Sequence, residues 1–359
     1  MLCCCAMTRR ELLRGILATG SGLAVGCAGP SAEQRAAARR LLQDTLSVDL
    51  HSHPGMLPGS RFTLDQHLQR LAEGRVNVSL FSAVADGPLL AFRPGTGMYA
   101  TRSPRPGELY AHTYRALAPV RQRIASGRLA LIRTATDLEA ARTASQQAAI
   151  LATEGADFLE GRLERVQEAY ERGIRSIQLV HYRVNELGDI QTEPPVHGGL
   201  TRFGKDVVRE MNRLGMLIDL AHATLAGVRS AVEVSTKPMI VSHTNLQNAS
   251  GWARFVSLEH ARLVTERGGI IGSMPIALGV RGFEGFVGEI MRLVDGVGVD
   301  HVAIGTDMDG IIRQSVIFDD YADWPSIAGA LLARGLGPAD VAKILGGNFQ
   351  RLFREVTGT

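Results

Sequence analysis

Eight short apolar runs alternate with helical stretches along most of this chain, and this alternation constrains the fold more than any other feature. Short apolar runs predict buried strands, and the amphipathic stretches between them predict helices. Alternating strands and helices form parallel βα units, and eight such units favour a closed α/β barrel of the (β/α)8 TIM type. The predicted strands are 48–53, 76–83, 148–154, 176–182, 216–222, 238–243, 269–273 and 302–307.

An open, doubly wound sheet is the main alternative for the same alternation. It gives no reason for polar residues at so many strand ends, whereas the carboxyl ends of barrel strands face the active-site mouth. A lead-in helix is expected at 32–43, and further helices at 206–214, 258–266 and 286–294. The long segment 87–106, which is interrupted by prolines, is expected to be a loop that shapes the mouth.

Composition excludes several classes of protein. The 359 residues are 45% hydrophobic and 21% charged, which is typical of a globular protein and not of a disordered chain, a coiled coil or a small disulfide scaffold. The net charge is +3, and no basic block stands out. We therefore do not expect nucleic acid as a partner.

Cysteine is confined to the beginning of the chain, at Cys3, Cys4, Cys5 and Cys27. The body after Cys27 therefore has neither a disulfide nor a thiolate ligand for a metal. Any metal bound by the body must be held by histidine, aspartate and glutamate.

Residues 1–30 have the order of an export signal, with basic residues first, then an apolar run and then small residues. Arg9 and Arg10 resemble a twin-arginine signal, and the segment that ends in Cys27 resembles a lipoprotein cleavage box. We expect export across the cytoplasmic membrane, followed either by lipid anchoring at Cys27 or by release as a periplasmic protein. Residues 31–359 are expected to form a single catalytic domain.

Polar side chains recur where the predicted strands end. Residues 51 and 53 of one strand point to the same face, so both imidazoles can approach one ion. His222 and His243 end consecutive strands, which places them side by side. The strand-end residues are His51, His53, Glu154, His181, His222, His243 and Asp307.

Each of these residues alone could be an ordinary structural group, such as a hydrogen-bonded histidine or a strand-to-turn aspartate. Together they indicate a metal site, and imidazole with carboxylate suits Zn²⁺, with other divalent transition ions as alternatives. The remaining histidines lie outside the pattern and are expected to be structural or surface groups; they are His67, His112, His197, His260 and His301.

Several long motifs, taken in order, resemble the membrane (renal) dipeptidase family, which is peptidase family M19 of the amidohydrolase superfamily. The resemblance runs from about residue 48 to residue 353. Its most specific stretches are 199–204, 211–222, 238–243, 266–272, 301–310 and 346–348.

The resemblance implies a (β/α)8 barrel that binds two zinc ions. In this chain His51 and His53 would hold the first ion, and Glu154 would bridge both ions. His222 and His243 would hold the second ion.

The resemblance also implies three residues that act on the substrate. His181 matches a substrate-facing histidine that would stabilise the oxyanion, and Arg254 matches the arginine that receives the substrate carboxylate. Asp307 matches the aspartate beside the bridging water and would transfer the proton.

One position departs from the family. The first strand usually carries His-x-Asp, and this chain has His51-Ser52-His53. The exchange removes one negative charge from the site. We expect metal binding to persist, because His-x-His is common in the wider superfamily.

The resemblance predicts a zinc-dependent dipeptidase, a metallohydrolase that cleaves a small dipeptide with a metal-activated hydroxide. One alternative is an amidohydrolase that acts on N-acyl amino acids, β-lactam-like amides or lactones. A second is a secreted metal-binding protein without catalysis. The sequence leaves the oligomeric state open, including a homodimer.

Overall fold

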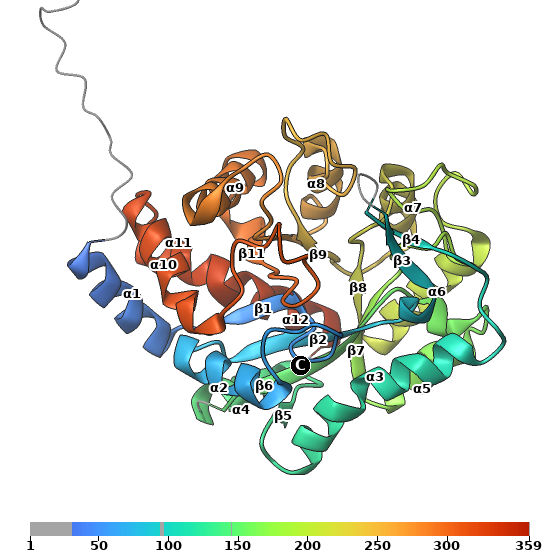
Figure 1. Cartoon of the computed structure of the whole chain (residues 1–359), viewed down its shortest axis with the longest axis horizontal. Coiled ribbons are helices and arrows are strands. Elements are labelled where there is room, and N and C mark those ends of the chain that lie inside the picture. The colour runs from blue at the N-terminus through green and yellow to red at the C-terminus, as the bar shows by residue number, and fades with distance from the viewer. Residues whose placement is uncertain (1–30, 94–96, 145, 359) are drawn as a thin grey trace, which may run out of the picture.

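The computed structural model of the chain describes residues 31–358 except 94–96 and 145 (Figure 1). The predicted export signal at 1–30, with Arg9, Arg10 and Cys27, lies outside the described residues. Among the helices of the described part, none combines the length and the apolar character that crossing a bilayer requires.

Eight parallel strands form the centre of the molecule, in the order β1-β2-β6-β7-β8-β9-β10-β11. Their order in the sheet follows their order along the chain, as right-handed βα units require. The strands are β1 (Val48–Ser52), β2 (Val78–Val84), β6 (Ala148–Glu154), β7 (Ile174–Gln178), β8 (Leu217–Asp219), β9 (Ile240–Thr244), β10 (Ile270–Ser273) and β11 (Val302–Ile304).

The ring closes just beyond β11, where the chain runs parallel to β1. Ser52 and Met308 form a parallel bridge. The His53 amide donates to the Met308 carbonyl at 2.8 Å, and the Asp307 amide donates to the His51 carbonyl at 2.9 Å. Closure confirms the predicted (β/α)8 fold, and it brings the first and last candidate site residues together.

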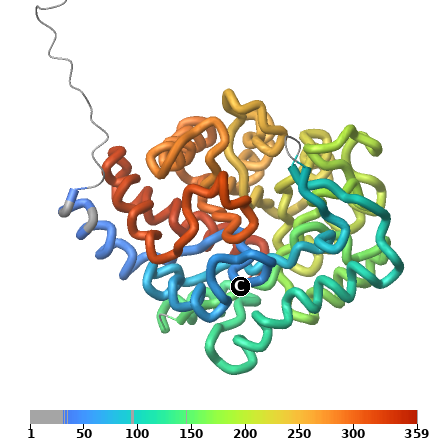
Figure 2. The backbone as a smooth tube through the Cα atoms, in the orientation of Figure 1, coloured from blue at the N-terminus to red at the C-terminus, as the bar shows by residue number. Residues whose placement is uncertain are grey.

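The barrel strands are buried throughout, because helices cover their outer faces and side chains fill the interior. Strand residues such as Leu50, Ile150 and Leu217 form one buried cluster with Phe349 and Phe353 of α12 (Asn348–Thr357). The C-terminus lies near the middle of the view in Figure 2. This packing fills the barrel interior and leaves polar chemistry to the strands' carboxyl ends.

The helices between the strands begin and end at residues suited to those positions. The Thr201 hydroxyl caps α6 (Arg202–Leu214) by accepting from the Gly204 amide, and Gly215 ends the helix at φ 70°.

The other helices are α1 (Ala32–Asp44), α2 (Leu64–Gly74), α3 (Glu108–Ala125), α4 (Ala135–Ala144), α5 (Glu164–Glu171), α7 (Leu225–Val234), α8 (Leu258–Thr265), α9 (Gly282–Val297), α10 (Trp324–Ala333) and α11 (Pro338–Ala342). The short helical turns are η1 (Gly87–Leu89), η2 (Asp157–Leu159), η3 (Val299–His301), η4 (Tyr321–Asp323) and η5 (Lys343–Gly347).

All eight predicted strands are present, with ends displaced by a few residues. The segment 87–106 is not purely a loop, because it carries an antiparallel pair, β3 (Leu90–Arg93) and β4 (Gly97–Ala100). A further short strand, β5 (Ala130–Leu131), pairs with β6 beside β2.

Candidate metal centre

The predicted site residues meet at the carboxyl end of the barrel. Glu154 is the last residue of β6, and His243 is the next-to-last residue of β9. His51 is in β1, and His53 follows its end directly. The other four, which are His181, His222, Arg254 and Asp307, lie in segments beyond the strand ends.

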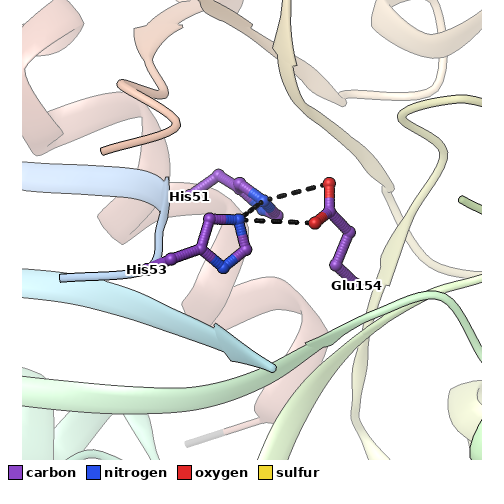
Figure 3. Close-up of side chains that lie close together, drawn as sticks. All are labelled: His51, His53 and Glu154. Carbon is purple, nitrogen blue, oxygen red and sulfur yellow. Dashed lines mark hydrogen bonds and ion pairs between the residues drawn. The ribbon is translucent and has the colours of Figure 1, made fainter. Parts of the chain in front are cut away.

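The Glu154 carboxylate is surrounded by five imidazoles, and all five present Nε2 to it. Figure 3 shows His51 of β1 and His53, which follows β1, with their ring nitrogens aimed at the two carboxylate oxygens. The Nε2 distances to the nearest Glu154 oxygen are 3.4 Å for His51, 3.3 Å for His53, 3.3 Å for His181, 3.3 Å for His222 and 3.5 Å for His243.

Four of these imidazoles form two buried triads that share Glu154: His51 and His53 belong to the first, and His222 and His243 to the second. Nε2 of His51 lies 3.2 Å from Nε2 of His53, and Nε2 of His222 lies 3.1 Å from Nε2 of His243. Ligands about 2.0–2.1 Å from a tetrahedral Zn²⁺ lie about 3.3 Å from one another. The donor atoms of both triads therefore fit the spacing that one ion in each triad needs.

Hydrogen bonds at Nδ1, on the far side of the rings, leave Nε2 as the atom that can bind a metal. Nδ1 of His53 lies 2.6 Å from the Ser82 carbonyl, which can only accept, so Nδ1 carries the proton. Nδ1 of His243 lies 2.9 Å from the Ser242 hydroxyl. A partner at Nδ1 leaves the Nε2 lone pair for a metal. His53 therefore has the geometry of a metal ligand.

Burial keeps two of the imidazoles neutral. It lowers the pKa of His222 well below the usual value, and the positive charge of Arg254 lowers it further. Burial likewise lowers the pKa of His243 well below its usual value. Burial raises the pKa of Glu154, but the charges of His181 and His51 outweigh it and hold that pKa well below the usual value. These are the protonation states that bind a cation at the second triad.

At the first triad, burial lowers the pKa of His53, but hydrogen bonds to Asp307 and Glu154 outweigh burial and raise that pKa to about 10. A metal ion must therefore displace a proton there.

Two buried aspartates hold the strand ends that carry these ligands. Asp219 accepts from the amides of Ala221 and Ser242, each at 3.0 Å. Asp49 accepts from the Thr306 amide at 2.8 Å and from the Tyr321 hydroxyl at 2.6 Å. Neither aspartate was predicted, although each lies two or three residues before a ligand histidine.

Arg254 is buried beside the second triad. Its Nη1 donates to the Gln191 side chain at 2.7 Å, and its Nη2 lies 3.1 Å from Nε2 of His243. It makes no ion pair with a carboxylate among the described residues. Because Nε2 has one lone pair, metal binding at His243 requires Nη2 to leave it. The guanidinium is then a buried cation with a donor free for an anionic ligand.

Asp307 lies over the first triad, with Oδ1 3.3 Å from Nε2 of His53. Its backbone is left-handed at φ 49°, a conformation that costs a non-glycine residue energy and is concentrated at functional sites. A Cβ at Gly310 would lie 2.0 Å from Asp307 Oδ1. Glycine at 310 is therefore required for this placement of the carboxylate.

His181 has an orienting partner that was not predicted. Asp86, fully buried just after β2, lies with Oδ1 2.7 Å from Nδ1 of His181, and its Oδ2 accepts from the Tyr182 amide at 3.1 Å. Burial lowers the pKa of His181, but the negative charges of Asp86 and Glu154 outweigh it and raise that pKa. His181 can thus hold protons on both ring nitrogens, with Nε2–H facing the cavity.

Two histidines outside the predicted pattern lie close to the site. His112 lines the cavity, with Nε2 3.1 Å from the Val84 carbonyl. His67 is buried, and its Nε2 lies 2.9 Å from Asp309 Oδ2, whose carboxylate also accepts from the Gly55 amide at 2.8 Å. The expected structural role therefore suits His67, whereas His112 faces the cavity in which the candidate metal ligands lie.

A cavity of about 780 Å³ opens over the two triads. Seven of the eight predicted site residues line it, and the eighth, His51, lies directly behind His53. The structure thus brings together every residue predicted to act in the site. Their roles stay predictions.

Several known proteins resemble this chain in sequence. The family model for membrane dipeptidase (peptidase family M19) matches residues 35–359. The dipeptidase tcpJ of Claviceps purpurea is 31% identical over 239 residues, 64% of this chain and 56% of that protein. Dipeptidase 3 of Mus musculus is 29% identical over 234 residues, 62% of this chain and 47% of that protein. The chain spans about half the length of these curated relatives.

Solved structures share the fold at lower sequence identity. The probable dipeptidase PvdM from Pseudomonas aeruginosa superposes with a TM-score of 0.78 at 18% identity, over 90% of this chain and 98% of that one. A metallo peptidase from Rhodobacter sphaeroides, liganded with a phosphinate mimic of the dipeptide L-Ala-D-Ala, superposes with a TM-score of 0.72 at 21% identity, over 87% and 100%. Because the family model covers nearly all of the described residues, the chain belongs to the membrane dipeptidase family, peptidase family M19.

Proposed function

We propose that this protein is a metal-dependent hydrolase that cleaves the peptide bond of dipeptides. The observation that carries the proposal is the convergence of five imidazole Nε2 atoms on the buried Glu154 carboxylate. Family membership supports it, since relatives that share up to 31% of their aligned residues are named dipeptidases.

We propose Zn²⁺ as the metal, one ion in each triad. The donor set contains imidazole and carboxylate only, which suits zinc and leaves other divalent transition ions as alternatives. When bound, two divalent cations would acidify the attacking water and polarise the scissile carbonyl. The protein's own contribution is to bind the substrate, to move the proton and to stabilise the oxyanion.

Asp307 is placed to move the proton. Its carboxylate stands at the cavity side of the first triad and is partly open to solvent, unlike Glu154. It accepts the proton of the attacking water and then delivers it to the leaving amine, so one group serves as base and then as acid. His181, held by Asp86, donates from Nε2 to the oxygen on which negative charge develops.

Arg254 is placed to bind the substrate. A buried guanidinium without a carboxylate partner attracts an anion strongly, and its planar fork matches a carboxylate. The free C-terminal carboxylate of a dipeptide supplies that anion a short distance from the scissile amide. A single clamp so close to the reacting centre favours substrates with one residue on the carboxylate side of the scissile bond.

The proposal is tested by assaying the purified, Zn²⁺-loaded protein against a dipeptide panel. We expect chelator-sensitive hydrolysis and a loss of at least about 100-fold in kcat for Asp307→Asn, since general acid–base catalysis contributes about 10²–10⁴-fold. The matched control Asp206→Asn changes a surface aspartate of α6 and should keep the wild-type rate. Cleavage that is unaffected by chelator would contradict the proposal.

We propose further that the protein is exported. Arg9 and Arg10 before an uncharged apolar run support a twin-arginine signal, and Cys27 supports lipid anchoring. Replacing both arginines by lysine should retain unprocessed protein in the cytoplasm. Cys27→Ala should release the mature protein from membranes. Normal export of the double variant would exclude the twin-arginine route, and unchanged fractionation of Cys27→Ala would exclude the anchor.

A further inference from the structure

Part of the cavity lining consists of apolar side chains that cleavage of a small dipeptide does not need. The β3–β4 hairpin and two segments beside the first triad contribute them. We call them the apolar wall, which consists of Met56, Leu57, Leu90, Phe92, Ile311 and Ile312. The cavity volume of about 780 Å³ is within the range that holds ligands considerably larger than a dipeptide.

The wall begins at the first triad, and Arg254 lies at the second. The Met56 amide donates to the His53 carbonyl at 2.9 Å, so the wall starts directly after that ligand. A Cβ on Gly310 would lie 3.0 Å from His53 Cδ2, and Ile311 and Ile312 follow Gly310. A substrate whose carboxylate binds Arg254 beside His243, and whose scissile carbonyl lies between the two triads, would place its acyl part towards His53, where Met56 and Ile311 line the cavity.

The charges at this end suit an uncharged acyl group better than an α-ammonium. The carboxylates that line the cavity are Glu154, Asp307 and Asp309, counted over the described residues. Five imidazoles surround Glu154, and Asp309 is paired with His67 and the Gly55 amide. Asp307 is the remaining carboxylate, and the proposed catalysis requires it to transfer the proton. An ammonium buried there would lack an anion of its own and would pay a desolvation cost.

The wall continues out of the cavity to the protein surface. Phe92 is 50% exposed and Ile312 is 44% exposed, and they are two of the few large apolar side chains exposed in the described part of the chain. Exposed apolar side chains that are continuous with a cavity indicate a surface that a ligand covers. The wall therefore extends from the cavity to solvent, so an elongated group could lie along it.

We infer that the apolar wall binds the acyl chain of N-acyl amino acids, with alkyl chains of medium length, and that these are better substrates than small dipeptides. The inference rests on the proposed amide hydrolysis. Water cleaves the C–N bond: its OH joins the acyl carbon and its hydrogen joins the amino nitrogen. The products are a fatty acid and a free amino acid.

The test is a chain-length series on the Zn²⁺-loaded enzyme, with N-acetyl-, N-hexanoyl-, N-octanoyl- and N-decanoylalanine, and with alanyl-alanine as the reference dipeptide. We expect kcat/KM to rise about two- to fourfold per added methylene, as burial of a methylene predicts. The longer compounds should exceed alanyl-alanine.

Two variants connect the effect to the wall. Phe92→Ser, at an exposed position of the hairpin, should reduce kcat/KM by an amount that grows with chain length. Val196→Ser is the matched control, because Val196 is 71% exposed and does not line the cavity. It should leave the chain-length dependence unchanged. An equal effect of both variants at all chain lengths would overturn the assignment of the wall.

Binding to chelator-treated protein gives a readout that is independent of turnover. In calorimetric titrations with the same acylalanines, the Kd of the wild type should decrease as the acyl chain lengthens. The Kd of Phe92→Ser should decrease less over the same series. If alanyl-alanine is cleaved but neither rate nor Kd depends on chain length, the acyl-chain inference is wrong and the proposed function stands. If the Zn²⁺-loaded enzyme cleaves neither acylalanines nor alanyl-alanine, the acyl-chain inference and the proposed function are both wrong.

Discussion

Asp86 Oδ1 lies 2.7 Å from Nδ1 of His181, and both groups are buried. A fixed negative charge at Nδ1 keeps the proton on that nitrogen, raises the pKa of the ring and turns Nε2 towards Glu154. The proposed donation to the oxyanion requires a proton on Nε2 as well. Asp86 therefore sets both the direction and the protonation state of His181.

The first prediction concerns the loss of this charge. Asp86→Asn lowers the pKa of His181, so the imidazolium is lost at lower pH than in the wild type. We expect kcat to fall about 10- to 100-fold, in the range found for residues that orient an active-site histidine. The alkaline limb of the kcat profile should move to lower pH. A uniform fall in kcat with an unmoved alkaline limb would contradict this role, and Asp206→Asn serves as the surface control.

The second prediction concerns Gly310. In Gly310→Ala the new Cβ would lie 2.0 Å from Asp307 Oδ1, and the flexible carboxylate must move away. The fold should persist and kcat should fall about 100-fold or more, because the proton-transfer group is displaced. Gly288→Ala in α9 is the matched control, since no atom lies near its Cβ. It should leave activity unchanged and stabilise the helix by about 0.5–1 kcal/mol. Wild-type activity in Gly310→Ala would show that Asp307 does not need its present position.

The third prediction concerns the stability of the protein in acid. His260 of α8 is buried, its Nε2 has no hydrogen-bond partner among the described residues, and burial lowers its pKa to about 4. The unfolded chain therefore binds a proton between about pH 6.5 and pH 4 that the folded protein does not. This contribution to stability is fully present above pH 6.5 and is lost as the pH falls.

His260→Leu removes that titration. The wild type should lose up to about 3 kcal/mol more unfolding free energy than His260→Leu between pH 7 and pH 4. Urea unfolding at both pH values measures the difference. The control His197→Gln changes an exposed histidine and should keep the wild-type pH dependence. Parallel losses in wild type and His260→Leu would show that His260 does not contribute.

The fourth prediction concerns His53, the departure from the family pattern. An imidazole must lose its proton to bind a metal, and Asp307 and Glu154 raise the pKa of His53 to about 10 against the effect of burial. A proton therefore competes with the metal at the first site, and metal binding there should weaken as the pH falls. His53→Asp should retain activity and bind metal more tightly than the wild type at about pH 6. The difference in affinity between the two proteins should be smaller at about pH 8. His53→Ala should lose the first metal and most of its turnover. If His53→Ala keeps both the first metal ion and its turnover, His53 is a structural residue and not a metal ligand.

Much of the barrel follows from local sequence. Apolar runs and helical periodicity identify all eight barrel strands, and 148–154 agrees with β6 at both ends. Other boundaries shift because an apolar run does not always end with its strand. The run that ends at Val180 continues beyond β7, which ends at Gln178. The β3–β4 hairpin was not predicted, since its strands lack β-branched residues and prolines surround them.

The candidate ligands were predictable because barrel topology brings strand ends together. The same rule could have identified Asp86, which lies two residues after the end of β2. Gln191, which holds Arg254, lies in an irregular segment without periodicity, and only the folded structure shows the contact. The hydrogen bond from His53 to the Ser82 carbonyl is likewise a tertiary contact that no local pattern encodes.

The central claim is that Glu154 joins two imidazole triads into a site for two cations, and metal analysis tests it most directly. After loading with Zn²⁺ and removal of free metal, we expect the wild type to retain close to two ions per chain, one for each triad. Glu154→Gln should retain fewer than one, because a neutral amide bridges two cations poorly, and the surface control Glu186→Gln should match the wild type. Full metal content in Glu154→Gln, or no zinc in the wild type, would contradict the account.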